Sequence, residues 1–326
     1  MPRTEVRGMA PSAADLLRPK PFRGDVVAAG VVVLATLVYV VAVRFDDAWG
    51  AGAHLAYAAV AWAFVTAMAV LAPMERDEPR AYQSVLYVSS FALLMVVLAE
   101  LGRVLGADGA LSSAGNGTWF FAALAAYALA FAVRRNSAVC TLLGALSGGA
   151  AVLAAVSWIG DAPHFATDRW VLVGLMVVYG LAAIGQRDRR LRHGVALIDA
   201  AGLAALVIGW SFAANEFFFA DDGTEQAITG VAWGWELLIL AAGFGLIAYS
   251  SVDRQPGPAY LGVGNLVAFA VITAVGVTRQ GATLLGWPVA LAVASAALLA
   301  IGLRPTTPAP PAPDVDAPEP PPLPLR

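Results

Sequence analysis

The run VVAAGVVVLATLVYVVAV, residues 26–43, decides the fold class of this chain. It contains no charged side chain, and it lacks the alternation of polar and apolar residues that a membrane β-barrel strand requires. A helix rises about 1.5 Å per residue, so roughly 20 apolar residues cross the ~30 Å hydrocarbon core of a bilayer. Backbone N–H and C=O groups in lipid must bond within the protein, as they do in a helix. The run therefore predicts a transmembrane helix.

Comparable apolar runs recur along the whole 326-residue chain. The composition agrees with membrane insertion, because 59% of the residues are hydrophobic and only 13% are charged, whereas soluble domains carry about 25% charged residues. We predict an all-α integral membrane protein, a ten-transmembrane-helix bundle with short loops. The predicted helices span residues 26–43, 53–72, 82–101, 117–133, 138–159, 170–185, 195–214, 232–249, 259–277 and 284–303.

Two tails flank the predicted membrane domain of residues 26–303. Residues 1–25 precede it, and the first apolar run ends without a small-residue cleavage site, so we expect a signal anchor. Residues 304–326 contain ten Pro, which predicts a disordered cytoplasmic tail biased to polyproline II. This tail is either solvated without a partner or a polyproline ligand for a cytoplasmic protein.

The basic residues predict the orientation. Of the twenty Lys and Arg residues, sixteen fall in the two tails and in alternate loops, and the other side holds only Arg44, Arg103, Arg169 and Arg279. Short cytoplasmic loops are enriched in Lys and Arg, so the N- and C-termini are both predicted to be cytoplasmic. The abundance of Ala and Arg, with a single Lys, favours a GC-rich bacterial genome. We therefore predict a multi-pass protein of the bacterial cytoplasmic (inner) membrane.

Tryptophan gives an independent indication of the same topology. Only Trp62 of the nine Trp residues maps to the middle of a predicted helix, and the other eight map to the predicted outer ends. Indole rings favour the headgroup level, where the ring is partly apolar and the N–H stays wet. A missed helix would have moved the later Trp residues to the other side.

Two patterns suggest internal organisation. The first is a candidate threefold repeat of a helical hairpin. The first helix of each hairpin begins at a tryptophan, namely Trp119, Trp170 and Trp235. The second helix carries a polar residue at similar depth, namely Ser147, Asp199 and Asn265. The number and orientation of the helices also resemble those of the drug/metabolite transporter superfamily. In the first half of the chain, Leu37-Val38-Tyr39 is similar to Val177-Val178-Tyr179 in the second half. This resemblance implies two inverted five-helix halves around a substrate site. No functional residue is carried over from it.

Asp199 and Asn265 are the candidate substrate- or ion-contact residues. Asp199 is expected about five residues into its helix, and an ionisable group within a membrane is a functional candidate by default. Asn265 lies at comparable depth and would be its partner. The alternative role of Asp199 is a cap or an ion pair with Arg189, Arg190, Arg192 or His193.

The other ionisable residues near the membrane have structural interpretations. Glu100 and Arg103 are expected to form an exposed i,i+3 pair. Glu236 is expected near a helix N-terminus, where a carboxylate offsets the macrodipole, and His54 also lies at a helix start. The deep polar groups are expected to hydrogen-bond between helices; they are Thr36, Thr66, Ser89, Ser90, Ser147, Asn265 and Thr273. The glycine-rich runs at residues 144–149 and 243–245 favour close helix packing, with unwinding of a helix around a substrate as the alternative.

No catalytic motif is present, such as HExxH, GxSxG, CxxC or a P-loop, and we expect neither an enzyme nor a cofactor. Three scattered His residues and the lone Cys140 argue against a metal site, and no folded basic surface for nucleic acid is predicted. Two hypotheses remain. One is a small-molecule permease, and the other is an accessory or scaffold protein that binds another membrane subunit or a second copy of itself.

Overall fold

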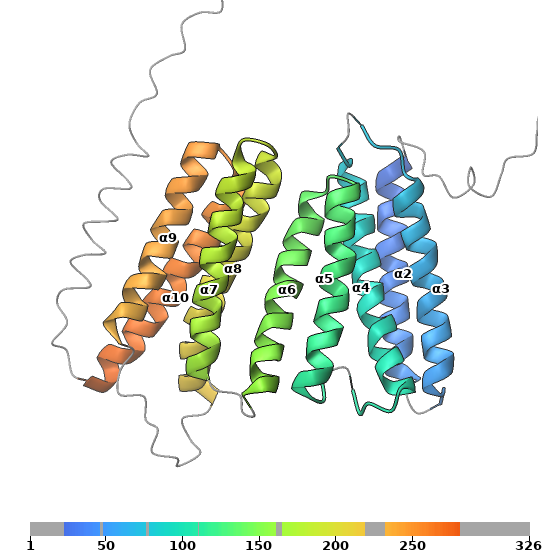
Figure 1. Cartoon of the computed structure of the whole chain (residues 1–326), viewed down its shortest axis with the longest axis horizontal. Helices are drawn as coiled ribbons and strands as arrows, with labels where there is room; N and C mark the ends of the chain where they lie inside the picture. Colours follow the sequence, from blue (N-terminus) through green and yellow to red (C-terminus); the bar gives the residue numbers. More distant parts are fainter. Residues whose placement is uncertain are drawn as a thin grey trace, which may run out of the picture. The chain divides into compact units, whose positions relative to one another are not determined.

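A computed structural model describes residues 23–45, 48–75, 78–109, 111–160, 165–218 and 232–280. Apart from an isolated bridge between Glu75 and Glu78, the regular structure in these ranges is helical (Figure 1). The helices are α2 (Gly24–Arg44), α3 (Ala51–Leu71), α4 (Ala81–Val104), α5 (Ala114–Arg134), α6 (Ala138–Ile159), α7 (Phe165–Arg187), α8 (Leu191–Phe218), α9 (Trp233–Asp253) and α10 (Pro256–Gln280).

These nine helices coincide with the first nine predicted runs, and each is long and apolar enough to cross a membrane. The part of the chain that the structure describes is therefore a polytopic helical membrane protein. The predicted tenth helix, residues 284–303, lies outside the described residues, as do the tail of residues 304–326 and nearly all of residues 1–25. Several helices are longer than predicted. In particular, α8 begins at Leu191 rather than at residue 195.

Local side-chain bonds explain where several helices begin. Ser113 and Ser137 accept a hydrogen bond from the backbone N–H three residues ahead, which caps α5 and α6. Gln83 fixes the start of α4, because its Oε1 accepts from the Arg80 N–H at 2.7 Å and its Nε2 donates to the Pro73 carbonyl at 2.9 Å. Arg254 adopts a left-handed backbone (φ 53°) at the end of α9, so the chain turns directly into α10.

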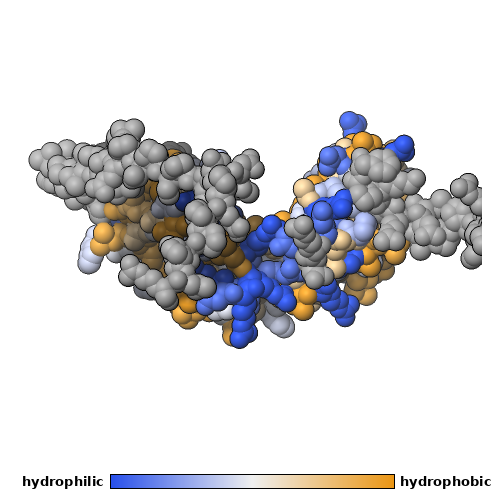
Figure 2. All heavy atoms as spheres, turned by 90° about the horizontal axis from the view of Figure 1, so that it is seen from above, coloured by the Kyte–Doolittle hydropathy of each residue, from blue (hydrophilic) through white to orange (hydrophobic). Residues whose placement is uncertain are grey.

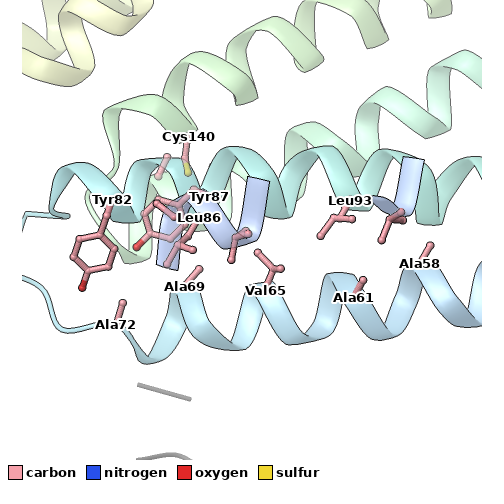
Figure 3. Packing of buried hydrophobic residues seen from close by; sticks show 14 residues of the cluster. Ala58, Ala61, Val65, Ala69, Ala72, Tyr82, Leu86, Tyr87, Leu93 and Cys140 are labelled. Atoms are coloured by element: carbon pink, nitrogen blue, oxygen red, sulfur yellow. The ribbon is translucent and has the colours of Figure 1, made fainter. Parts of the chain in front are cut away.

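The core of the first helices is built from small residues on α3 and larger ones on α4. Figure 3 shows Ala58, Ala61, Val65 and Ala69 of α3 lined up along α4, with Leu86 and Leu93 facing them. Cys140 of α6 joins the same cluster beside Tyr87. The small side chains along this row allow α3 to approach α4 closely, as is usual for helices packed within a membrane.

The outward faces of the helices are apolar. Ile184 of α7 and Tyr260 of α10 expose 70% and 75% of their surfaces, whereas the polar Gln83 and Asn265 are fully buried. In water, exposed apolar surface costs about 25 cal/mol per Å², so this arrangement suits lipid. Large exposed apolar side chains occur on most helices, for example at Val33, Val60, Val133, Val177, Val252 and Val263.

Charge and tryptophan separate to opposite ends of the helices. Successive helices run in opposite directions, so every second connecting turn lies at the same end of the helices. Figure 2 is a view onto the end that holds the α7–α8 turn, and hydrophilic residues gather there. This end carries Arg23, Arg80, Arg134, Arg135, Arg187, Arg189, Arg190, Arg192 and Arg254. The opposite end carries Arg44, Arg103 and Arg169 together with Trp49, Trp119, Trp158, Trp170, Trp210, Trp233 and Trp235. We call these the arginine-rich end and the tryptophan-rich end.

Candidate functional site

Asp199 lies deeper in its helix than the sequence predicted. Because α8 begins at Leu191, Asp199 is two turns into it, about 12 Å along the axis from the first residue. Its carboxylate faces the start of α10. A Cβ added to Gly257 would lie 3.0 Å from Oδ2, so the glycine lets the acid approach the backbone of α10 closely. Within the described residues, Oδ1 is buried and accepts no hydrogen bond.

Three of the basic residues around the start of α8 have other partners. Arg187 binds Asp253 at 2.6 Å, and Arg192 binds Glu78 at 2.6 Å. His193 is buried, with Nδ1 2.5 Å from the Thr141 hydroxyl and Nε2 2.9 Å from Asn136 Oδ1. No ion pair with Asp199 occurs in the part of the chain that the structure covers. The carboxylate instead has the N-terminal turn of α10 beside it, which favours negative charge.

Asn265 bridges two helices instead of meeting Asp199. Its Nδ2 donates to the Gly202 carbonyl of α8 at 3.1 Å and to the Leu261 carbonyl of its own helix at 2.9 Å. Its Oδ1 is buried, and no donor reaches it from the described residues. Asp199 contacts the first turn of α10, whereas Asn265 lies eight residues further along, or about 12 Å. The structure therefore places both residues at the α8–α10 contact but in separate environments.

An open pocket lies between α7, α8 and α9, next to the turn that bears Asp199. Its volume is about 270 Å³. The small residues Ala201, Gly202, Ala242 and Gly245 hollow it out, since larger side chains at these positions would reduce its volume. The remaining lining residues are Met176, Ile198, Leu246 and Tyr249. The pocket therefore offers apolar surface along its length, and Tyr249 is the lining residue whose side chain carries a polar group.

Polar groups gather beside Tyr249, one turn before the arginine-rich end of α9. The Tyr249 hydroxyl lies close enough to Asp253, Arg187 and Asp199 to interact with their charges. The Arg187 guanidinium lies 6.0 Å from the centre of the Tyr249 ring. The Asp253–Arg187 pair is internally neutral, so Asp199 supplies the uncompensated charge of the group. The pocket and these residues together can hold an apolar body and, at one end, a polar or cationic group.

The remaining ionisable candidates are structural. Glu100 and Arg103 approach to 3.5 Å as predicted, but the expectation of an exposed pair is wrong for Glu100, whose side chain is only 7% exposed. Glu236 lies in the first turn of α9, and His54 is buried in α3 beside Trp49. Among the described residues, no group of His, Cys, Asp and Glu is arranged to hold a metal ion.

Two polar clusters were not predicted from the sequence. The first is a group of three hydroxyls from α3, α4 and α5, those of Thr66, Ser90 and Tyr127. Thr66 Oγ1 lies 2.9 Å from Ser90 Oγ and 3.0 Å from the Tyr127 hydroxyl. At the tryptophan-rich end, Arg169 of α7 contacts Ser211 and Phe212 of α8. Thr66 and Ser90 bond between helices as predicted, but the prediction is wrong for Thr36, Ser147 and Thr273, which donate to carbonyl groups of their own helices. The sequence held no signal for Tyr127, the common partner of Thr66 and Ser90.

The members of the proposed hairpin repeat make different contacts. Trp170 and Trp235 do meet, with ring centres 5.1 Å apart. Ser147, however, bonds the Leu143 carbonyl of its own helix, whereas Asn265 bonds across to α8. Similar depth in the sequence does not give these polar residues a shared role.

Comparison with known proteins adds no family to these observations. No protein-family model matches the chain, and neither a curated protein nor a solved structure is similar to it.

Proposed function

We propose that this protein is a permease of a bacterial cytoplasmic membrane that carries a small amphipathic molecule, with both termini in the cytoplasm. The observation that carries the proposal is the open 270 Å³ pocket between α7, α8 and α9, with the unpaired Asp199 carboxylate on the adjacent turn. Ligand pockets are concave and mostly apolar, with few polar groups that fix orientation. The proposal is non-enzymatic, and the arginine-rich end would face the cytoplasm.

The roles in this proposal follow from position. The apolar lining would hold the body of the molecule, and Tyr249 would fix its polar end by a hydrogen bond. Asp199 would supply charge, because a carboxylate beside an apolar pocket attracts a cationic group or a proton far more strongly than one in water. Asn265 keeps α10 against α8 and so supports the position of Asp199.

Two variants test the proposal in liposomes. Nothing lies within 4 Å of a Cβ added to Gly245, so Gly245→Leu should fill the pocket without displacing a neighbour. Asp199→Asn should remove the charge while keeping the size of the side chain. We expect uptake of small amphipathic compounds, and the accompanying change in tryptophan fluorescence, to fall at least tenfold in both variants.

Matched controls come from similar positions away from the pocket. Gly180→Leu on α7 adds the same side chain where nothing lies within 4 Å, and Asp188→Asn removes an exposed charge in the α7–α8 turn. Both should transport at the rate of the unmodified protein. Equal uptake in Gly245→Leu and in the unmodified protein would reject the pocket as the substrate site.

A scaffold protein is the second candidate. It is supported by the packing of α2–α5, where the hydroxyls of Thr66, Ser90 and Tyr127 satisfy one another and small residues fill the contacts. A scaffold would bind another membrane subunit or a second copy of the chain through its apolar outer surface. If no compound produces saturable uptake, and crosslinking in membranes gives one defined higher-mass product, the scaffold is favoured over the permease.

A further inference from the structure

Arg169 is held in one orientation at the tryptophan-rich end. Its Nε donates to Ser211 Oγ at 2.9 Å, and one Nη donates to the Ser211 carbonyl at 3.4 Å. The centre of the guanidinium lies 3.5 Å from the centre of the Phe212 ring, a close cation–π contact. Within the described ranges, no carboxylate pairs with it.

The guanidinium keeps donors that the protein does not use. Arg carries five N–H donors, and the contacts with Ser211 use two of them. The planar fork of Arg matches the oxygens of a phosphate or carboxylate. The positive charge, its fixed plane and its remaining donors therefore suit an anion.

The surroundings of Arg169 point to a lipid as the source of that anion. Trp235 packs 5.8 Å from Phe212 and 5.1 Å from Trp170, measured between ring centres. Trp170, which follows Arg169 in the chain, is 66% exposed. Indole rings at the end of a membrane helix lie at the headgroup level, next to the phosphates. Soluble anions have no need of such an apolar border.

We propose that Arg169 binds the phosphate of an anionic phospholipid in the leaflet at the tryptophan-rich end. Ser211 and Phe212 position the guanidinium, and the Trp170–Trp235 pair contacts the glycerol and upper acyl region. This site is independent of the proposed permease function, because it lies at the opposite end of the helices from Asp199. Neither proposal depends on the other.

The test is lipid binding by the purified full chain, measured by native mass spectrometry during titration with phosphatidylglycerol. We expect Arg169→Gln to weaken the tightest binding event about tenfold, the usual effect of losing a charge-assisted hydrogen-bonded pair. Arg44→Gln is the matched control. Arg44 lies at the same end, precedes Phe45, which stacks on Trp49, and is exposed, so its loss should leave that event within twofold. Equal losses in both variants would show nonspecific charge attraction and overturn the proposal.

Ser211→Ala provides a second variant that keeps the charge. Removing Oγ frees the guanidinium to rotate, so affinity should fall about threefold, and Arg169→Lys should also bind more weakly because Lys lacks the planar fork. Unchanged affinity in both would reject an oriented site. Phosphatidylcholine with the same acyl chains should bind more weakly, and inorganic phosphate should not displace the lipid. Displacement by inorganic phosphate would identify a soluble-anion site and reject the lipid.

Discussion

A single hydroxyl, that of Tyr127, joins three helices. It lies 3.0 Å from Thr66 Oγ1 of α3 and also bonds Ser90 of α4, and the ring itself packs on Phe131 with centres 5.0 Å apart. In membrane proteins, hydrogen bonds of this kind contribute about 0.6 kcal/mol on average, with a maximum near 1.7. The geometry places Tyr127 above that average because its hydroxyl bonds two partners.

Tyr127→Phe should lower the free energy of unfolding by about 1 kcal/mol. The ring and its packing remain, and only the hydroxyl is lost, so Thr66 and Ser90 keep their mutual bond. Unfolding in a titration with sodium dodecyl sulfate, followed by circular dichroism, gives the value. Tyr39→Phe is the control, since Tyr39 is 62% exposed on α2 and should show no measurable change. Equal effects at both positions would mean that the hydroxyl cluster contributes nothing specific.

The sequence identified the polar residues but not their partners. Asp199, Asn265, Thr66 and Ser90 stand out because polar groups are rare in these helices. The sequence does not show whether each of these side chains faces lipid or another helix. In a soluble helix the apolar stripe marks the buried face, but a membrane helix is apolar on both its lipid-facing and its protein-facing sides. This is why Tyr127 went unnoticed, whereas Glu100 was expected to be exposed because it lies near the outer end of its helix.

At the scale of elements, α9 and α10 are joined by a backbone contact between glycines. A Cβ added to Gly262 would lie 2.7 Å from the Gly243 carbonyl oxygen and 3.1 Å from the Ile247 backbone nitrogen. Backbone atoms cannot rotate away as a side chain can. The glycines therefore set the distance between these two helices, as small residues do in other membrane proteins.

Gly262→Ala should destabilise the protein by about 2 kcal/mol, because the two helices must separate to admit one methyl group. The detergent titration described for Tyr127 measures this loss. Gly180→Ala on α7 introduces the same change where nothing lies within 4 Å, and it should be neutral or stabilising by up to about 1 kcal/mol. A neutral result at Gly262 would show that the contact between α9 and α10 is looser than the structure has it.

The helices themselves were the most predictable feature of the chain. A run of about 20 apolar residues has one structural solution in lipid, and residues 138–159 were predicted with the bounds of α6. Ends were less certain where polar residues continue a helix, as at Leu191–Gly194 of α8. The pocket between α7, α8 and α9 could not be predicted, because it depends on how three apolar helices are rotated about their axes.

For the whole molecule, the separation of Arg from Trp predicts which end faces which compartment. Lys and Arg near short loops are retained in the cytoplasm during insertion, so the arginine-rich end should be cytoplasmic. The native Cys140 is buried and should react little with a membrane-impermeant maleimide, so single introduced cysteines can be followed against a low background.

Two exposed positions give opposite expectations in intact bacterial cells whose outer surface the reagent can reach. Ser112→Cys lies in the turn before α5 at the tryptophan-rich end, and it should be labelled at once. Asp188→Cys lies in the α7–α8 turn at the arginine-rich end, and it should be labelled only after the membrane is permeabilised. The reverse pattern would place both termini outside. It would also leave the Asp199 pocket nearer the external side of the membrane than the cytoplasmic side.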